Sequence, residues 1–213
     1  MHKNFRKNRK TVRQILNHHF DRFGKCDRIK TLASHLKMPT LFFEKKDEEK
    51  TMIPERLAAL REKMRAYGVD AYLVPTADYH ESEYVGTYFK ARTYITGFTG
   101  SAGTAVITQD EACLWTDGRY FVQAAKELAG TGVTLMKMGQ EGVPTVEEYL
   151  QANTKEGMTI GFDGRVVNEM LGETLEKTLP ERFLSYRSDL IGEIWSDRPA
   201  LSAEPVWLLD SKY

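Results

Sequence analysis

From Met52 onward the sequence alternates between helical and strand patterns, and this alternation is the strongest constraint on the fold. The first pattern is IPERLAALREKMRAYG, whose apolar residues recur every three to four positions, as on one face of a helix. Pro54 suits the first turn of such a helix, and Gly68 suits its C-terminal cap. We therefore expect an amphipathic helix over residues 53–67.

Short apolar runs separated by polar turns follow this helix. They predict strands in the segments DAYLVP, GTAVIT, ACLWTD, VTLMKM, TIGFD and FLSYR. The turn Gln109-Asp110-Glu111 predicts that GTAVIT and ACLWTD form an antiparallel hairpin. Helices are predicted in GRYFVQAAKELAG, in PTVEEYLQAN and from Asn168 to Leu179. Strands alternating with helices, plus one hairpin, predict an α/β domain with a mixed β-sheet flanked by helices on both faces.

Residues 1–51 have a different composition. Residues 1–50 carry fourteen Lys/Arg against six Asp/Glu, a balance of +8, so the remaining chain carries −8. A basic arm could bind nucleic acid or an acidic membrane surface, or serve as a transit peptide. Its apolar residues keep no period for long, so we expect a disordered or weakly helical N-terminal extension that the domain does not need for folding. Met52 could be the natural start.

The composition excludes several classes of protein. No window approaches the eighteen or so apolar residues that span a bilayer, and the first twenty residues lack the apolar core of a secretory signal. A cytoplasmic protein is the expectation. Two cysteines, Cys26 and Cys113, are too few for a disulfide framework, and Cys113 is expected to be a buried thiol.

The loop Gly97 to Gly103 has glycines spaced GxxGxxG, which fits neither a dinucleotide fingerprint nor a P-loop. The next element is a strand rather than a helix, so phosphate binding is not expected. The spacing instead indicates positions where the backbone needs a positive φ or approaches a neighbour closely.

Reactive groups are scarce in the part that is expected to fold. His80, Glu81 and Glu83 invite a metal interpretation, but no second cluster of ligands with suitable spacing accompanies them. Ser82 and Ser101 lack the GxSxG motif of a nucleophile elbow. We therefore predict no catalytic residue and no metal ligand in this chain.

Arg119 is the candidate binding residue. Asp117 and Gly118 lie where a strand passes into a helix, so Asp117 can cap the first turn and Arg119 leaves from its start. A planar guanidinium on so rigid a seam can hold a carboxylate or a carbonyl at fixed geometry. Trp115 and Tyr120 are expected to anchor the seam in the core. The alternative is a structural salt bridge from Arg119 to a neighbouring Asp or Glu.

Five segments in order carry a resemblance to a known family: VPTADYHESEY, RTYITGFTGSAGTAVIT, LWTDGRYFVQAAKEL, TLMKMGQEGVPTVEEYL and EIWSDRP. From about Met52 to Val206 the chain resembles the creatinase-type N-terminal domain of Xaa-Pro aminopeptidases (aminopeptidase P), and most of all the long, three-domain cytosolic form. The resemblance implies a ribonuclease H-like α/β fold over residues 52–206. Residues 207–213 would then be the start of a following domain.

The resemblance also implies where the chemistry lies. In that family a C-terminal "pita-bread" domain holds two divalent metals, usually manganese, through two Asp, one His and two Glu. These metals activate a water against the peptide bond before proline. This chain does not contain those five ligands, so it is expected to bind no metal and to be inactive alone.

The family also implies a role for particular residues. Arg119 matches the arginine of the TDGRY motif that contacts bound ligand, with Asp117, Trp115, Tyr120 and His80 supporting the site. The domain would shape the substrate cleft and contribute to dimer contacts. The expected partners are peptides with proline in second position and, for the whole enzyme, a second copy in a homodimer, with no specific nucleic acid and no membrane.

Two departures from the family pattern concern packing more than the site. Ile191-Gly192 stands where the family tends to have Val-Asp, and GFDGRVV lacks the proline that usually follows Gly-Val-Asp. Two hypotheses remain. Either the chain is the N-terminal part of a metal-dependent Xaa-Pro aminopeptidase, truncated or encoded as a fragment, or it is a stand-alone, non-catalytic peptide-binding or interaction module.

Overall fold

The computed structural model describes residues 38–187, 189–205 and 207–212. The chain divides into two units, Met1–Lys46 and Asp47–Tyr213, and the second contains the β-sheet. Most of the predicted N-terminal extension, with Cys26 and four of the five histidines, lies outside the described residues. Helix α3 (Met38–Tyr67) runs across the predicted boundary at 51/52 without a break.

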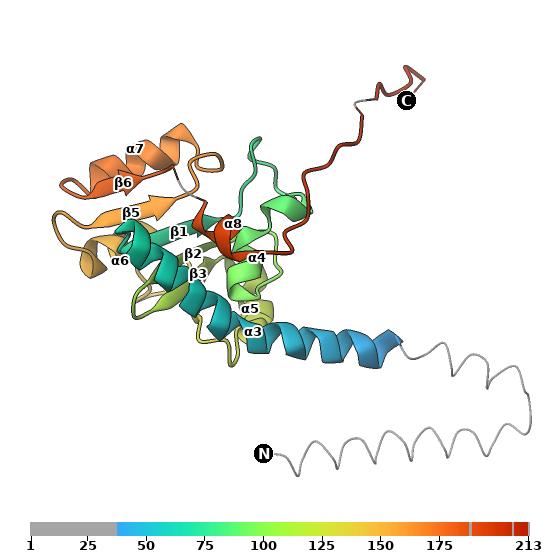
Figure 1. Cartoon of the computed structure of the whole chain (residues 1–213), viewed down its shortest axis with the longest axis horizontal. Helices are drawn as coiled ribbons and strands as arrows, with labels where there is room; N and C mark the ends of the chain where they lie inside the picture. Colours follow the sequence, from blue (N-terminus) through green and yellow to red (C-terminus); the bar gives the residue numbers. More distant parts are fainter. Residues whose placement is uncertain (1–37, 188, 206, 213) are drawn as a thin grey trace, which may run out of the picture. The chain divides into compact units, whose positions relative to one another are not determined.

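Six strands form one sheet in the order β4-β3-β2-β1-β5-β6 (Figure 1). They are β1 (Ala71–Pro75), β2 (Thr104–Thr108), β3 (Ala112–Thr116), β4 (Thr134–Lys137), β5 (Thr159–Phe162) and β6 (Phe183–Ser185). Strand β2 is antiparallel to both of its neighbours, and the other pairings are parallel. The sheet is therefore mixed, and all six predicted strands are confirmed.

The helices that follow α3 are short. They are α4 (Ala91–Thr96), α5 (Phe121–Glu127), α6 (Val146–Asn153), α7 (Glu169–Thr178) and α8 (Leu190–Ile194), with 3₁₀ turns η1 (Thr87–Phe89) and η2 (Gly118–Tyr120). The predicted helices correspond to α3, α5, α6 and α7. Elements α4, α8 and η1 were not predicted, because so few residues show no full helical period.

Helix α3 confirms the predicted apolar stripe but corrects the place of Pro54. The stripe residues Ile53, Leu60 and Met64 are completely buried, and each contributes about 1.5–3 kcal/mol relative to an exposed side chain. Pro54 lies inside the helix rather than in its first turn, where it has no backbone N–H to donate. Gly68 ends the helix with a φ of 65°, as predicted.

Helices cover both faces of the sheet. On one face the strand side chains pack against α3, α4, α5 and α8, and they include Tyr72, Val74, Ala105, Ile107 and Leu114. On the other face they pack against α6 and α7, and they include Leu73, Val106, Trp115, Ile160 and Phe162. Figure 1 shows α7 alongside β5 and β6. Successive strand residues point to opposite faces, which accounts for two separate cores.

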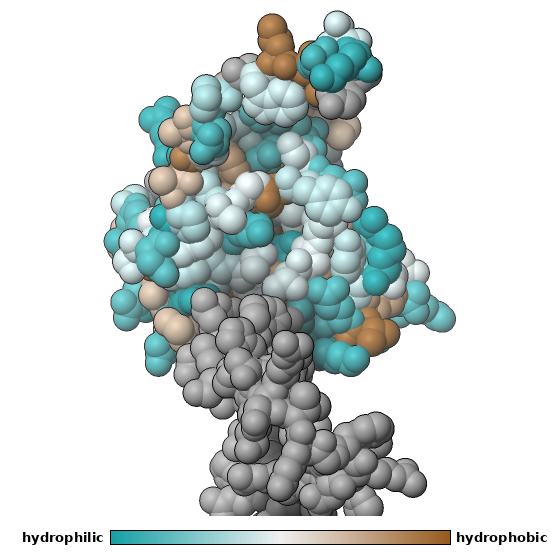
Figure 2. Space-filling view, turned by 90° about the vertical axis from the view of Figure 1, so that its right-hand side faces the viewer, coloured by the Kyte–Doolittle hydropathy of each residue, from teal (hydrophilic) through white to brown (hydrophobic). Residues whose placement is uncertain are grey.

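The surface outside these cores is mostly polar. On the face shown in Figure 2, hydrophobic residues occur in small groups among hydrophilic ones. Among the described residues, no helix is both long and apolar enough to cross a membrane.

The strand directions bring several loops together at one end of the sheet. Strands β1, β3, β4, β5 and β6 end at this side, whereas the reversed strand β2 begins there. We call this side the carboxyl edge. The loop that enters β2 therefore lies beside the turns that leave β1 and β3.

Candidate functional site

The loop Gly97–Gly103, which we call the glycine loop, is shaped by its three glycines. Gly97 caps α4 with a φ of 77°, a conformation that favours glycine. A Cβ on Gly100 would lie 2.3 Å from Cζ of Phe98 and 2.8 Å from Cδ1 of Tyr120, and one on Gly103 would lie 2.9 Å from the Trp115 carbonyl oxygen. One positive φ and two close approaches confirm the conformational interpretation of this motif.

Asp117 and Arg119 form a compact pair directly after β3. Asp117 is the N-cap of η2, and its Oδ1 accepts from the backbone N–H of Arg119 at 3.0 Å. The Arg119 guanidinium donates to the same carboxylate through Nε at 2.9 Å and through Nη2 at 3.0 Å. These hydrogen bonds hold the pKa of Asp117 below its usual range and raise that of Arg119.

The pair leaves much of Arg119 open to solvent. Its side chain is 63% exposed, and beyond Asp117 its nearest acidic neighbour is Glu83, with Nη1 and Oε1 4.0 Å apart. The salt bridge considered from the sequence is thus present. It fixes the orientation of the Arg119 guanidinium and leaves part of that group exposed to solvent. A guanidinium held in this way can donate further hydrogen bonds to an oxygen atom of a ligand.

Trp115 is buried beside this pair, and Tyr120 is half-buried against the core. Trp115 is 1% exposed, and its Nε1 donates to the Pro144 carbonyl at 2.7 Å. The Tyr120 hydroxyl lies 2.7 Å from Oγ of Ser101, and its ring meets that of Phe98 edge to face. The Arg119 guanidinium lies 5.3 Å from the centre of the Tyr120 ring.

The segment after β1 approaches Arg119 through Glu83 rather than through His80. Asp78 is buried, and its Oδ1 accepts from the backbone N–H groups of His80 and Ser82. The His80 side chain is exposed, and no polar contact joins it to Arg119 among the described residues. Among all the residues that the structure describes, no three His, Cys, Asp or Glu side chains are grouped to hold a metal ion.

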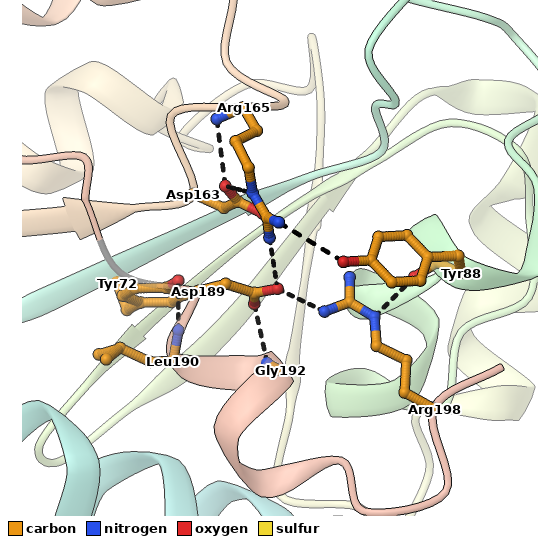
Figure 3. Close-up of polar contacts among 8 residues, drawn as sticks. All are labelled: Tyr72, Tyr88, Asp163, Arg165, Asp189, Leu190, Gly192 and Arg198. Carbon is orange, nitrogen blue, oxygen red and sulfur yellow. Dashed lines mark hydrogen bonds and ion pairs between the residues drawn. The ribbon is translucent and has the colours of Figure 1, made fainter. Parts of the chain in front are cut away.

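A second Asp-Gly-Arg turn follows β5 at the same edge. Arg165 repeats the geometry of Arg119, since its backbone N–H and its Nε both donate to Oδ1 of Asp163, at 3.1 and 2.8 Å. Its Nη2 donates to Oδ2 of Asp163 and also to Oδ2 of Asp189, each at 2.8 Å. Figure 3 shows this guanidinium in contact with the two carboxylates and the Tyr88 hydroxyl, and the Arg165 side chain is 48% exposed.

Asp189 is the centre of this second cluster (Figure 3). Besides Arg165, it binds Nη1 of Arg198, and its Oδ1 caps α8 by accepting from Gly192 N–H at 2.8 Å. The Arg198 guanidinium lies 3.9 Å from the centre of the Tyr88 ring. The cluster joins the turn after β5 to η1, to α8 and to the segment that leaves the sheet.

The sequence interpretation missed several of these residues. The repeated Asp-Gly-Arg, at 117–119 and 163–165, was a visible signal for Arg165. Nothing local marked Asp189 or the buried residues Arg92 and Glu127, because their partners lie in other elements. The departures at Ile191 and Gly192 are in α8, where Ile191 packs in the core and the Gly192 N–H donates to the capping Asp189.

The fold and the site define a class of protein: an α/β domain that presents a fixed, exposed arginine at the end of a strand. Residues 56–194 match the family model of the creatinase/prolidase N-terminal domain. The chain therefore belongs to the creatinase/prolidase N-terminal domain family.

Known proteins support the same assignment. Aminopeptidase P2 of Arabidopsis thaliana is 39% identical over 176 residues, which are 79% of this chain and 25% of that protein. The X-prolyl aminopeptidase of Caenorhabditis elegans, described as a cytosolic enzyme with a di-nuclear active site, is 38% identical with a TM-score of 0.69. The match covers 74% of this chain and 28% of that one. An Xaa-Pro aminopeptidase structure from Streptococcus pyogenes, at 24% identity and a TM-score of 0.51, covers 68% of this chain and 98% of that one and supports the fold alone. The chain spans about a quarter of the length of the curated relatives it matches.

Proposed function

We propose that this chain is the N-terminal, non-catalytic domain of a cytoplasmic, metal-dependent Xaa-Pro aminopeptidase. In this role it shapes the substrate cleft for peptides with proline in second position and contributes to a homodimer. The observation that carries the proposal is the exposed, pre-oriented Arg119 in a domain of this family. Asp117, Trp115 and Tyr120 hold that arginine in place.

A comparison within the chain favours a ligand role for Arg119 over a structural one. In both Asp-Gly-Arg turns the arginine donates two side-chain hydrogen bonds to the aspartate of the same turn. Arg165 has a further carboxylate, Asp189, at 2.8 Å, whereas the equivalent neighbour of Arg119 is Glu83 at 4.0 Å. Arg119 therefore keeps the greater capacity for a ligand such as a peptide carbonyl or carboxylate.

Bond cleavage is assigned to another part of the enzyme. The described residues contain no group of metal ligands, so they fit no di-nuclear centre, and no metal-dependent step is assigned to them. The C. elegans relative has a di-nuclear active site, and a pair of divalent ions, manganese by family resemblance, would lie outside the domain. This chain's part is to bind and orient the peptide.

The C-terminal segment is suited to contact a further domain. Trp207, Leu208 and Leu209 are 74%, 93% and 63% exposed. Consecutive large apolar side chains this open to water are unfavourable unless something covers them. A following domain of the same enzyme would supply that cover.

Sequencing the transcript past the codon for Tyr213 tests the proposal. A reading frame that continues into a domain with two Asp, one His and two Glu as metal ligands supports it. A natural stop would favour the alternative, a stand-alone peptide-binding module. The basic residues 1–50 keep a third, weaker alternative open, which is nonspecific and salt-dependent nucleic-acid binding.

A further inference from the structure

Three charged side chains are buried in the described part of the chain, namely Asp78, Arg92 and Glu127, at 8%, 3% and 7% exposure. Each of them binds the backbone of a loop at the carboxyl edge. A buried charge is costly unless its hydrogen bonds are satisfied. The three buried charges all lie at the carboxyl edge, which indicates that the loop conformations there are tightly fixed.

Arg92, in α4, binds the glycine loop from one side. Its Nη1 donates to the Phe98 carbonyl at 2.6 Å, and its Nη2 donates to the Gly100 carbonyl. Its Nε donates to Oγ1 of Thr76 at the end of β1, at 3.0 Å. Burial lowers the pKa of Arg92 to about 10, which still leaves the guanidinium charged at neutral pH.

Glu127, at the end of α5, binds the same loop through the intervening residue. Its Oε2 accepts from the Thr99 backbone N–H at 2.9 Å, and its Oε1 accepts from Oγ1 of Thr99 at 2.8 Å. Three consecutive backbone groups are thus bound: Arg92 donates to the carbonyls of Phe98 and Gly100, and Glu127 accepts from the N–H of Thr99 between them. The two charges together specify one conformation of the loop.

The glycine loop in turn fixes the position of Tyr120, the residue that follows Arg119. Ser101 is hydrogen-bonded to the Tyr120 hydroxyl, and the Phe98 ring packs on the Tyr120 ring. Gly100 leaves no space between these two rings for a Cβ. Tyr120 has little freedom to move unless the loop moves, and the Arg119 guanidinium packs over its ring.

We propose that Arg92 and Glu127 are positioning residues that fix the direction of Arg119 through the glycine loop and Tyr120. The part of this inference that concerns peptide binding rests on the proposed function. The positioning itself concerns only this chain and can be measured without a ligand.

The experiment uses the whole 213-residue chain and the variants Glu127→Gln and Arg92→Lys. The control is Glu111→Gln, which alters a carboxylate that accepts from the Tyr149 hydroxyl at the opposite end of the sheet. We expect the NMR signals of the Arg119 Nε–H and of Tyr120 to shift in both variants and to stay unchanged in the control. If they stay in place while only the melting temperature falls, the two residues are merely structural and the inference is wrong.

A milder variant protects the test against loss of the fold. Thr99→Ala removes the Oγ1 contact with Glu127 and keeps the backbone N–H contact. It should shift the Arg119 signal in the same direction by a smaller amount, and an unmoved signal in a folded Thr99→Ala protein would count against the inference.

Titration with the tripeptide Ala-Pro-Ala separates positioning from function. If the proposed function holds, Glu127→Gln should weaken the affinity about tenfold, since small misplacements of a binding group are costly. If Arg119→Ala leaves the affinity unchanged, the proposed function fails, while the Arg119 signal still decides whether Arg92 and Glu127 position it.

Discussion

At the scale of single residues, the two Asp-Gly-Arg turns show how one local motif can serve two purposes. In both turns an aspartate accepts hydrogen bonds from the backbone N–H and from the guanidinium of the arginine two residues later. The neighbours differ, because Arg165 has a second carboxylate, Asp189, at 2.8 Å and is 48% exposed, whereas the second carboxylate of Arg119, Glu83, lies at 4.0 Å and Arg119 is 63% exposed. The chain therefore contains its own matched control for the candidate binding residue.

Arg119→Ala is expected to impair peptide use without impairing folding. In a protein that carries both this domain and the metal-binding domain, kcat/KM for Xaa-Pro peptides should fall about 10- to 100-fold, as for a lost charge-assisted hydrogen bond. Arg119→Lys should recover part of the loss, since an ammonium lacks the planar fork. Arg165→Ala should do the reverse, lowering the melting temperature and sparing kcat/KM. Full activity with a lower melting temperature in Arg119→Ala would make that arginine structural.

Gly100→Ala and Gly172→Ala are expected to act in opposite directions. At Gly100 a Cβ meets two packed rings, and such overpacking costs about 1–3 kcal/mol of unfolding free energy. At Gly172, inside α7, a Cβ meets no atom within 4 Å. Alanine there should stabilise by about 0.5–1 kcal/mol, because a helix interior favours it. Urea unfolding of both variants checks the pair, and an unaltered midpoint for Gly100→Ala would contradict the close packing of the loop.

At the scale of elements, the sequence predicted what depends on local periodicity and missed what depends on distant partners. The four helices and six strands with clear apolar patterns were confirmed, and so was the hairpin of β2 and β3. Helix α8 was missed because it has five residues and is held by Asp189, whose side-chain partners Arg165 and Arg198 come from two other segments. The candidate site followed the same division, since Asp117 and Arg119 are local whereas Arg92 and Glu127 act across elements.

The Asp189 cluster should control the docking of α8. Asp189→Asn removes the charge that two arginines share, and the loss of these charge-assisted hydrogen bonds should lower the free energy of unfolding by about 1.5–3 kcal/mol. The stack of Tyr94 on Trp195, with centroids 4.5 Å apart, lies just beyond α8 and offers a fluorescence signal for its release. The control is Glu173→Gln, which disturbs an exposed pair with Lys177 and should leave both signal and stability unchanged. Equal stability of Asp189→Asn and wild type would mean that the cluster contributes nothing to docking.

At the scale of the whole molecule, the proposed function divides the work between this domain, which would bind the peptide, and a metal-binding domain, which would cleave it. The unit Asp47–Tyr213 has two cores, one on each face of the sheet, and an open edge that presents Arg119. The chemistry assigned to the family requires metal ligands that the described residues do not group together.

The purified chain should therefore not hydrolyse Xaa-Pro peptides, with or without added manganese. Water activation at neutral pH requires metal ligands or an equivalent base. A fluorogenic Xaa-Pro substrate and a known aminopeptidase P as positive control provide the assay. Turnover that scales with protein and metal and persists through repurification would refute the assignment of a non-catalytic domain.

A chain that begins at Asp47 should fold as well as the whole chain. A cut after residue 51, at the end of the predicted extension, would remove Lys50, whose ammonium donates to the Lys126 carbonyl at 2.7 Å, so the cut is placed before Lys50. The melting temperature should change by no more than about 2–4 °C, which corresponds to about 1 kcal/mol for this size. Calorimetry of the two proteins makes the comparison, and a drop of about ten degrees would show that the preceding residues stabilise the domain.

The reversed direction of β2 also gives experimenters a convenient handle. Its hairpin with β3 turns at Asp110, an exposed residue at the end of the sheet opposite to Arg119. In a chain that begins at Asp47 and so lacks Cys26, a cysteine introduced there could carry a fluorophore or attach the protein to a sensor chip, while the buried Cys113 stays protected. The immobilised domain would then present its carboxyl edge, and with it Arg119, to peptides in the flowing solution.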